Sequence, residues 1–301
     1  MLSEYSIRHE SSNVNLYFAF VLAVNLQRVW IITRKRDTIA SFFNGKEEAM
    51  LKVLPIASGS TGNSMLVDID GIRILIDLGV TAKTLLKTLA DNNYTCADID
   101  AVLITHTHSD HVKGLEVCLK RISAPVFLSH TSRDKLMLER ATALSYAEKT
   151  EILPGLWVTA IRTSHDCPGS IGFRIETTGT RFGYLTDLGV IPESTMELLF
   201  GSDCIIIESN HDKEMLRCGR YPYYLKKRIL SDQGHLSNEA CSEAVSRFAD
   251  KGTKVFFLAH LSQENNRPEL ALDSARKATA GMDVQIETLP VNGEKTIEVL
   301  K

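Results

Sequence analysis

The sequence predicts a mixed α/β (α+β) domain that carries polar side chains at the ends of its strands. Short apolar runs typical of buried strands alternate along the chain with segments whose apolar residues recur at helical spacing. Several of the strand-like runs end directly in histidine, aspartate or glutamate. The chain has 301 residues, of which 44% are hydrophobic and 24% charged, so it can bury one substantial core or two small ones.

Residues 1–49 differ from the rest of the chain, and we expect them to form an extension that the function does not need. The apolar run at 16–24 falls short of the roughly 20 residues that a membrane-spanning helix requires. Glu4 and Glu10 offset Arg8, and no clear small-residue cleavage site follows, which argues against a signal peptide. A weak membrane anchor and a packed accessory helix are the alternatives. The domain itself is expected to span residues 50–301.

The elements of this domain follow from turn signals and from the spacing of apolar residues. Asp70-Gly71 separates two apolar runs and predicts a tight hairpin, because this dipeptide suits the turn that a hairpin needs. Leu85 and Leu89 share one helical face, and Ser237 is a natural N-cap for the helix after it. Helices are expected over 81–92, 112–121, 132–143, 192–200, 238–250 and 268–279, and strands over 51–57, 65–69, 72–76, 101–104, 125–129, 157–163, 172–177, 181–185, 204–207, 254–259, 284–288 and 296–299.

The chain is organised around the segment 105–111, which follows a short apolar run. Three imidazoles and a carboxylate within six residues are costly to crowd together unless a cation accepts their lone pairs. His106 and His108 alternate on an extended segment, so both rings can reach one ion. Asp110 and His111 lie past the turn and would face a second ion. The alternative is a histidine-rich surface loop.

Residues 106–111 match the H-x-H-x-D-H signature, and the chain here resembles the metallo-β-lactamase-fold hydrolases. The resemblance extends over residues 51–301. Within that superfamily, the motifs at 58–64, 208–212 and 234–238 look most like the YycJ (WalJ) group of bacterial proteins, which is described as nuclease-like and as acting on DNA 5′ ends. The resemblance implies a four-layer αββα metallo-β-lactamase sandwich in two similar halves.

The resemblance also implies a set of metal ligands at the ends of strands. His106, His108 and His165 would hold the first ion, Asp110, His111 and His260 would hold the second, and Asp187 would bridge the two. From the residues alone, a lone histidine is usually structural. The alternative for Asp187 is a cap for the helix at 192–200, but that helix starts too late for it. Asp77 would accept a proton from the non-ligating nitrogen of a bound histidine, unless it only forms a turn. Nitrogen-rich ligation with carboxylates suits two divalent ions, Zn²⁺ or Mn²⁺, and Fe²⁺ acceptably.

Further polar side chains are candidates for contact with a substrate phosphate. A glycine- and serine-rich loop precedes the hairpin and leaves backbone N–H groups free to face an anion, which makes Ser58, Ser60 and Asn63 candidates. Asn210 and His211 follow another apolar strand-like run and are candidates for the same role. Each of these residues is otherwise explained as part of a turn or a cap.

His235 is the candidate acid of the reaction. It lies just before the helix capped by Ser237, where the helix N-terminus favours an anionic oxygen. The arrangement resembles that of the tRNA 3′-processing ribonuclease Z branch, in which a histidine before a similar helix assists at the scissile phosphate. The resemblance therefore implies catalytic roles for His235 and Asp110. The alternative is a turn histidine beside an ordinary cap.

Residues 213–228 contain six basic residues and one acidic residue, with three tyrosines interleaved. Basic and aromatic side chains together suit the backbone and bases of nucleic acid, although a solvated amphipathic helix also explains the charges. The whole chain has a formal net charge of -3, so contact with nucleic acid must come from a local patch. The six cysteines form no C-x-x-C pair, which is typical of free thiols in a reducing cytoplasm. We expect no obligatory protein partner and no membrane association.

These features together favour a metal-dependent phosphodiesterase that acts as a DNA 5′-exonuclease. Two ions about 4 Å apart would bridge a water and lower its pKa, giving a hydroxide nucleophile aimed at phosphorus. The first alternative is an ester, thioester or lactone hydrolase of the same fold acting on a small molecule, against which His235 and the basic stretch argue. A redox di-iron protein is disfavoured because such proteins carry glutamate where His108 stands. A non-catalytic binding module is disfavoured because every ligand position is filled.

Overall fold

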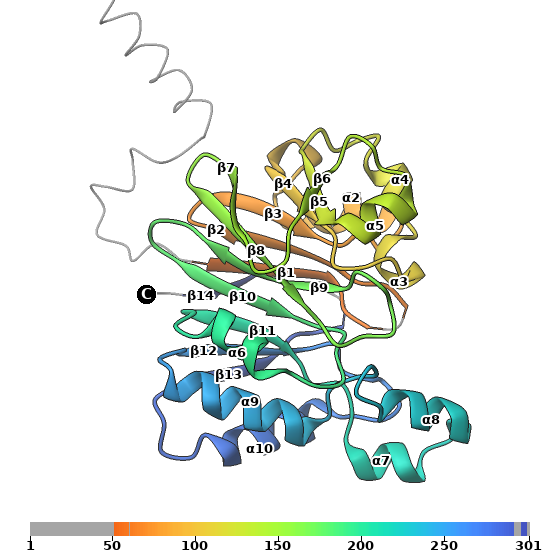
Figure 1. Ribbon diagram of the computed structural model, residues 1–301, viewed down its shortest axis with the longest axis vertical. Coiled ribbons are helices and arrows are strands. Elements are labelled where there is room, and N and C mark those ends of the chain that lie inside the picture. Colours follow the sequence, from red (N-terminus) through yellow and green to blue (C-terminus); the bar gives the residue numbers. More distant parts are fainter. Residues whose placement is uncertain (1–50, 60, 292–295, 300–301) are drawn as a thin grey trace, which may run out of the picture. The chain divides into compact units, whose positions relative to one another are not determined.

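The computed structural model describes residues 51–59, 61–291 and 296–299. The expectations for residues 1–49 and for Ser60 lie outside this described part of the chain. The strands form two sheets of seven strands each (Figure 1). Within the described residues, no helix is long and apolar enough to cross a membrane.

The first sheet has the strand order β14-β1-β2-β3-β4-β5-β6. Its strands are β1 (Leu51–Ala57), β2 (Ser64–Ile69), β3 (Ile72–Ile76), β4 (Ala101–Leu103), β5 (Val126–Ser129), β6 (Thr142–Leu144) and β14 (Ile297–Val299). Strands β2 and β3 pair antiparallel, and the turn between them places Asp70 and Gly71 at φ values of 49° and 82°. Both values suit an Asp-Gly hairpin turn, so the predicted hairpin is confirmed. From β3 to β6 the strands run parallel.

The second sheet has the order β13-β12-β11-β10-β9-β8-β7. Its strands are β7 (Lys149–Leu153), β8 (Leu156–Arg162), β9 (Ile171–Glu176), β10 (Arg181–Leu185), β11 (Cys204–Glu208), β12 (Val255–Ala259) and β13 (Gln285–Thr288). Strands β7 to β10 form an antiparallel meander, and β10 to β13 run parallel. Both sheets therefore combine an antiparallel and a parallel part.

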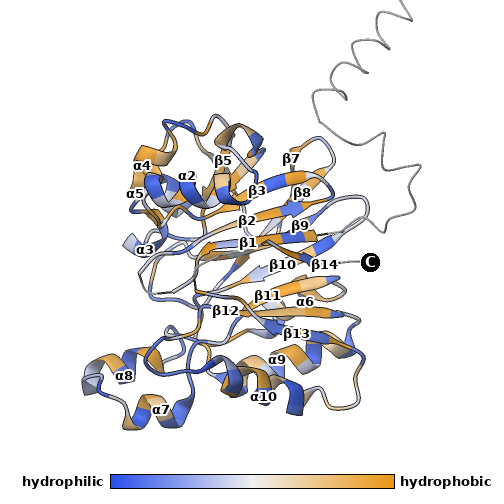
Figure 2. Cartoon of the chain, turned by 180° about the vertical axis from the view of Figure 1, so that it is seen from behind, coloured by the Kyte–Doolittle hydropathy of each residue, from blue (hydrophilic) through white to orange (hydrophobic). Residues whose placement is uncertain are grey.

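Three apolar cores separate four layers. The central core joins side chains from both sheets, such as Val67 of β2 and Phe173 of β9. A second core lies between the first sheet and helices that include α2 (Ala82–Asp91), through residues such as Leu85. A third lies between the second sheet and helices that include α9 (Asn238–Asp250), through residues such as Phe248. Apolar residues, orange in Figure 2, accordingly dominate the strands. The predicted αββα sandwich is confirmed.

The helices show where the expectations from sequence are wrong. Besides α2 and α9, they are η2 (Cys96–Asp98), α3 (Ser109–Val112), α4 (Leu115–Cys118), α5 (His130–Leu136), α6 (Glu193–Leu199), α7 (Lys213–Cys218), α8 (Tyr223–Ile229) and α10 (Pro268–Ala278). The single helix expected over 112–121 is two short helices with Gly114 between them. At Gly114 a Cβ atom would lie 1.8 Å from the carbonyl oxygen of Val80, so the chain turns here in close contact with the loop after β3.

The helix expected over 132–143 is also wrong. Helix α5 ends at Leu136, because Met137 adopts the left-handed conformation, and β6 follows. Strand β7 has no counterpart among the expected strands. It is a polar edge strand with no fully buried residue, so it lacks the apolar run that identifies the other strands.

The parallel strands direct several loops to one edge of the two sheets. Carboxyl ends of parallel strands meet at the same edge of a sheet, and ligands of such folds bind outside that edge. Strands β3 and β4 of the first sheet end there, as do β10, β11 and β12 of the second. Strand β8 runs in the same direction as β10, because β9 pairs antiparallel with both. The loops after these six strands carry the candidate site.

Candidate metal centre

The first ligand group consists of His106, His108 and His165. His106 and His108 lie on the loop after β4, and His165 lies on the loop after β8. His108 Nδ1 lies 3.1 Å from His106 Nε2 and 3.2 Å from His165 Nε2. Burial lowers the pKa of all three imidazoles, so they are neutral bases near pH 7. Three neutral imidazoles thus converge on one point.

The second ligand group consists of Asp110, His111 and His260. Helix α3 begins at Ser109, directly after His108, and this turn carries Asp110 and His111 past the first group. The ligand atoms of the three residues lie within 4.8 Å of one another. His111 Nε2 lies 3.5 Å from Asp110 Oδ2. The structure therefore joins the loops after β4 and β12 in a second cluster.

Asp187 lies between the two groups. Its Oδ2 is 3.5 Å from His111 Nε2, and its Oδ1 is 3.9 Å from His165 Nε2 and 3.7 Å from His260 Nδ1. The side chain is buried, and Oδ2 accepts no hydrogen bond from any described residue. An unpaired buried carboxylate oxygen is costly unless a cation binds it. Asp187 can therefore face an ion in either group.

Backbone conformation also distinguishes the site. Asp77, Asp187 and His260 have φ values of 59°, 58° and 56°, which non-glycine residues rarely adopt. Asp77 and His260 directly follow the last residue of a strand, and Asp187 is the second residue after the end of its strand. Such conformations cost about 1–3 kcal/mol each and persist where the surroundings impose them, most often at functional sites.

Two buried carboxylates hold the histidines of the second group. Asp77 Oδ2 accepts from His111 Nδ1 at 2.7 Å, and Glu208 Oε1 accepts from His260 Nδ1 at 2.6 Å. Both carboxylates are fully buried. Although burial opposes the charged imidazolium, these carboxylates and Asp187 raise the pKa of His111 and raise that of His260 to about 10. A carboxylate behind a ligating histidine fixes its orientation and raises its basicity.

Glu208 is the functional residue that the sequence analysis missed. The sequence places it at the end of an apolar strand-like run, but no role is predicted for it there. Its Oε1 also accepts from His235 Nδ1 at 2.8 Å, and its Oε2 accepts from the N–H groups of Leu188 and Leu236. The signal that identifies it is a carboxylate at the end of a strand that is otherwise wholly apolar.

His235 lies beside both ligand groups, and its side chain is 20% exposed. Its ring centroid is 5.4 Å from that of His165 and 5.3 Å from that of His260. Burial lowers its pKa, but the charge and hydrogen bond of Glu208 outweigh this and raise it. Because Nδ1 is engaged by Glu208, Nε2 is the nitrogen available to a substrate.

The separations of the donor atoms fit metal ions. Two ligands of one tetrahedral zinc, each about 2.1 Å from it, lie about 3.4 Å apart. The distances between His106, His108 and His165 (3.1 and 3.2 Å) and between His111 and Asp187 (3.5 Å) agree with this value. Asp187, Glu208, His235 and His260 also cluster. However, His260 Nδ1 and His235 Nδ1 lie 2.6 and 2.8 Å from Glu208 Oε1. These are hydrogen-bond distances, and they are too short for two ligands of one ion.

Two candidate phosphate contacts at the loop after β1 are engaged within the protein. The Ser58 hydroxyl accepts from the N–H of His260 at 3.1 Å. Asn63 Oδ1 accepts from the N–H of Gly59 at 2.8 Å, and its Nδ2 donates to Asp110 Oδ2 at 3.1 Å. Both side chains therefore position the second ligand group. Their contact with a substrate phosphate stays a prediction.

Two further candidates lie after β11. Asn210 Nδ2 donates to the carbonyl oxygen of His260 at 2.9 Å, so this side chain also braces a ligand loop. His211 is buried, and neither ring nitrogen has a hydrogen-bond partner among the described residues. Burial lowers its pKa to about 4, so the ring is neutral at physiological pH. Contact of either side chain with substrate stays a prediction.

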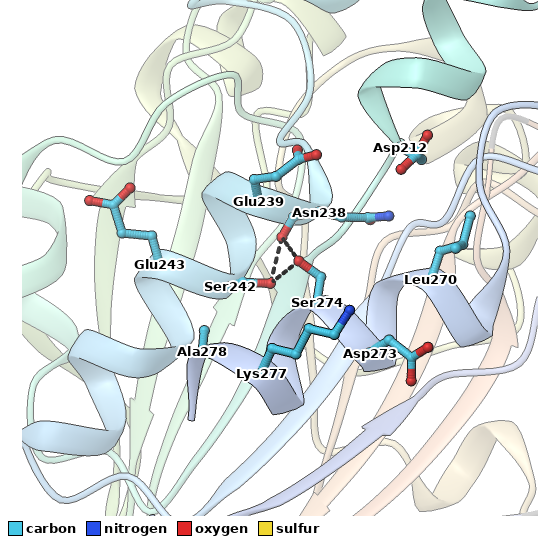
Figure 3. Close-up of a pocket in the computed structure, with 10 residues that line it drawn as sticks. All are labelled: Asp212, Asn238, Glu239, Ser242, Glu243, Leu270, Asp273, Ser274, Lys277 and Ala278. Carbon is cyan, nitrogen blue, oxygen red and sulfur yellow. Dashed lines mark hydrogen bonds between the residues drawn. The ribbon is translucent and has the colours of Figure 1, made fainter. Parts of the chain in front are cut away.

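A hollow of about 610 Å³ lies between α9 and α10 (Figure 3). The ten residues that line it include Asp212, Glu239, Glu243 and Asp273 but no member of the ligand groups. Ser242 and Ser274 close its floor with hydrogen bonds to each other and to the Asn238 carbonyl oxygen. Its four carboxylates make it unsuitable for an anionic substrate.

Comparisons with known proteins agree with this architecture. The family described as "Beta-lactamase superfamily domain" matches residues 72–261. Exodeoxyribonuclease WalJ of Streptococcus pneumoniae is 35% identical over 226 residues, which cover 72% of this chain and 83% of WalJ. Exodeoxyribonuclease YycJ of Bacillus anthracis is 32% identical over 223 residues, which cover 72% of this chain and 84% of YycJ.

A solved structure shows the same fold. The metallo-β-lactamase fold protein YhfI from Bacillus subtilis matches with a TM-score of 0.63 and 16% identity, over 82% of this chain and 99% of YhfI. The resemblance inferred from the H-x-H-x-D-H segment is thereby confirmed. The chain belongs to the metallo-β-lactamase-fold hydrolases, the metal-dependent hydrolases of the β-lactamase superfamily.

Proposed function

We propose that this protein is a phosphodiesterase that uses two divalent ions to remove nucleotides from the 5′ end of DNA. The observation that carries the proposal is the position of His235, beside both ligand groups and held by Glu208. The alkoxide that leaves a phosphodiester is a poor leaving group and benefits from a positioned acid. The names of WalJ and YycJ, both exodeoxyribonucleases, support DNA as the substrate.

The ligand groups define where the ions would bind. The first group would hold one ion, the second group the other, and Asp187 would contact both. When bound, such ions lower the pKa of water toward neutrality and neutralise charge on the phosphate oxygens. Zn²⁺ suits the nitrogen-rich first group, and Mn²⁺ suits the carboxylates of the second.

The protein's own residues then orient the reaction. Glu208 accepts a hydrogen bond from His235 Nδ1–H and raises the pKa of the ring, which favours the imidazolium and turns Nε2–H toward the substrate. From Nε2, His235 donates its single proton to the departing 3′ oxygen, and the ring becomes neutral with Nδ1–H still bonded to Glu208. A positioned acid of this kind contributes about 10²- to 10⁴-fold to the rate.

Replacement of His235 tests this role. The His235→Ala variant should lose about 10²- to 10⁴-fold in kcat on 5′-phosphorylated DNA with Mn²⁺, while its metal content stays at the wild-type value. The loss should shrink on a p-nitrophenyl ester of a nucleotide, because p-nitrophenolate leaves without protonation. His130→Ala is the matched control, since His130 is an exposed histidine at the start of α5.

Two results would count against the proposal. Folded, metal-loaded protein that leaves DNA intact while hydrolysing esters, thioesters or lactones would identify the small-molecule hydrolase instead. Wild-type kcat of the His235→Ala variant on DNA would show that His235 is not the acid of the reaction.

A further inference from the structure

Helices α7 and α8, with the turn between them, form a basic arm over residues 213–230, here called the α7–α8 arm. It contains six basic residues and one acidic residue in a chain whose net charge is -3. The arm is two short helices separated by residues 219–222. In both views α7 and α8 stand apart from α9 and α10, on the same side of the sheets as α3 (Figures 1 and 2).

Its aromatic and basic side chains face solvent. Tyr223 and Tyr224 are 81% and 74% exposed, and neither ring packs against another ring or a cation among the described residues. Arg220 and Lys227 are exposed and form no ion pair within the described part of the chain. Two adjacent exposed rings beside unpaired cations can stack on bases and pair with phosphates at the same time.

Hydrogen bonds join the segment after α8 to the loop that carries His165 of the first ligand group. The loop that carries His165 bonds the segment after α8 at three successive residues: Ser164 Oγ donates to Asp232 O at 2.7 Å, Asp166 N to Gln233 O at 3.1 Å, and His165 Nδ1 lies 3.2 Å from Gly234 O. A Cβ at Gly234 would lie 2.2 Å from the carbonyl oxygen of Ile229, so the chain folds tightly back on α8. The arm is thereby fixed relative to the site.

An ion pair also links the arm to the ligand histidines. Arg228 of α8 donates through Nε to Asp166 Oδ2. The other oxygen, Asp166 Oδ1, lies 3.4 Å from His108 Nε2 and 3.6 Å from His165 Nε2. Arg228 is half exposed, so its guanidinium lies at the rim of the first ligand group with donors open to solvent. Positive charge therefore extends from the rim outward along α8.

We propose that the α7–α8 arm binds the single-stranded DNA that leads into the site, with phosphates on Arg220 and Lys227 and bases stacked on Tyr223 and Tyr224. This inference rests on the proposed phosphodiesterase function. Single strands expose both a phosphate chain and the flat faces of bases, which is the combination that cations and solvent-facing aromatic rings recognise. The hollow between α9 and α10, whose four carboxylates outnumber its single lysine, is less favourable for such a strand than the basic arm.

Binding without turnover tests the arm directly. A fluorescent single-stranded oligonucleotide is titrated with protein in EDTA, where hydrolysis is absent, and the affinity is followed against salt concentration. Arg220→Gln with Lys227→Gln should reduce the slope of log K against log salt by about 1.4, which is about 0.7 for each phosphate that the variant no longer neutralises. Tyr223→Ala with Tyr224→Ala should weaken binding by at least about 5-fold, with little change in that slope. Lys83→Gln with Lys135→Gln is the matched control, because both lysines are exposed on helices beside the first sheet, α2 and α5, and form no ion pair among the described residues.

Activity on two substrates separates failure of this inference from failure of the proposed function. For both arm variants, kcat/KM on the oligonucleotide should fall at least about 5-fold relative to kcat/KM on bis(p-nitrophenyl) phosphate. Wild-type protein without activity on either substrate overturns the proposed function. The proposed role of the arm is overturned if the wild-type protein is active on both substrates and the arm variants equal the lysine control in DNA affinity and in this ratio of kcat/KM values. Equal losses on single-stranded RNA and DNA would assign the arm to nucleic acid in general and overturn its assignment to DNA.

Discussion

The two ligand groups hold their histidines by different kinds of partner. In the first group, His165 Nδ1 meets the carbonyl oxygen of Gly234 at 3.2 Å, and His106 Nδ1 meets the hydroxyl of Thr105 at 3.0 Å. Both partners are uncharged, and the carboxylate nearest His108, Asp166 at 3.4 Å, is already paired with Arg228. Burial therefore dominates, and the pKa values of these imidazoles lie below their usual range.

In the second group the same nitrogens meet carboxylates. His111 donates to Asp77 and His260 donates to Glu208, and the pKa values of both histidines are raised. Without metal, protons on these histidines balance the buried negative charge. A metal ion must displace those protons from the second group, whereas the first group already presents free lone pairs. The two ions should therefore differ in how strongly pH controls their binding.

The largest effect should come from Asp187, which lies between the two groups and is proposed to contact both ions. Asp187→Asn keeps the shape of the side chain but removes its charge, so both ions lose an anionic ligand. We expect kcat to fall by at least about 10³-fold, equivalent to several kcal/mol of charge stabilisation, together with a lower content of both metals. Asp134→Asn, at an exposed carboxylate, is the control. Wild-type metal content in the Asp187→Asn variant would mean that neither ion needs Asp187, and would contradict this prediction.

Most of this site could be predicted from sequence because its residues directly follow apolar runs. His165, Asp187 and His260 come from three loops far apart in the chain, yet each loop follows a strand that ends at the same edge. Strand direction therefore decides which loops meet, and an apolar run indicates the strand. The meeting of these side chains at one edge follows from this topology, whereas their assignment as metal ligands comes from the resemblance of residues 106–111 to the H-x-H-x-D-H signature.

The supporting contacts could not be predicted, because they depend on side-chain direction. Asn63 and Asn210 are candidate substrate contacts by sequence, but packing turns both amides toward the ligand loops. Glu208 bonds two histidines that lie 27 and 52 residues away in the chain. No local pattern encodes such contacts. Likewise, a left-handed residue at Met137 ends α5, and sequence periodicity gives no sign of it.

Variants of the carboxylates that bond the histidines of the second group should change metal affinity at one group and not at the other. Asp77→Asn and Glu208→Gln each remove a charge that supports one histidine of the second group. The affinity of one of the two ions should fall by about 10- to 100-fold, while the other ion stays close to its wild-type affinity. A two-site competition titration with a chromophoric chelator measures both constants. Equal weakening at both sites would contradict the division into two groups.

The pH dependence of metal binding should differ between the groups. A histidine with a raised pKa keeps its proton until the pH exceeds that value, which for metal-free His260 is about 10. Affinity at the second group should therefore rise by about tenfold per pH unit between about pH 7 and 8 for each proton displaced. Histidines of the first group have lowered pKa values and are already neutral, so their affinity should stay constant over this range. Parallel pH profiles at the two sites would contradict the comparison.

The smallest effect should come from Thr105, whose hydroxyl touches both groups. It donates to Asp77 Oδ2 at 2.7 Å and lies 3.0 Å from His106 Nδ1 and 3.3 Å from His111 Nδ1. Thr105→Val keeps the shape of the side chain and leaves Asp77 its bond from the Thr105 N–H. Loss of the hydroxyl should reduce the free energy of unfolding by about 1–2 kcal/mol, measured in urea against Thr84→Val at an exposed position of α2.

Metal affinity in the Thr105→Val variant then shows how independent the two groups are. Asp77 keeps its charge, its bond to His111 and the bond from the Thr105 N–H, so the second group should weaken by only about 3-fold. The first group should weaken by a similar factor, because His106 loses its only polar partner outside the ligand groups among the described residues. A much larger loss at the second group than at the first would mean that Thr105 orients Asp77, and that the carboxylate depends on the hydroxyl to hold His111.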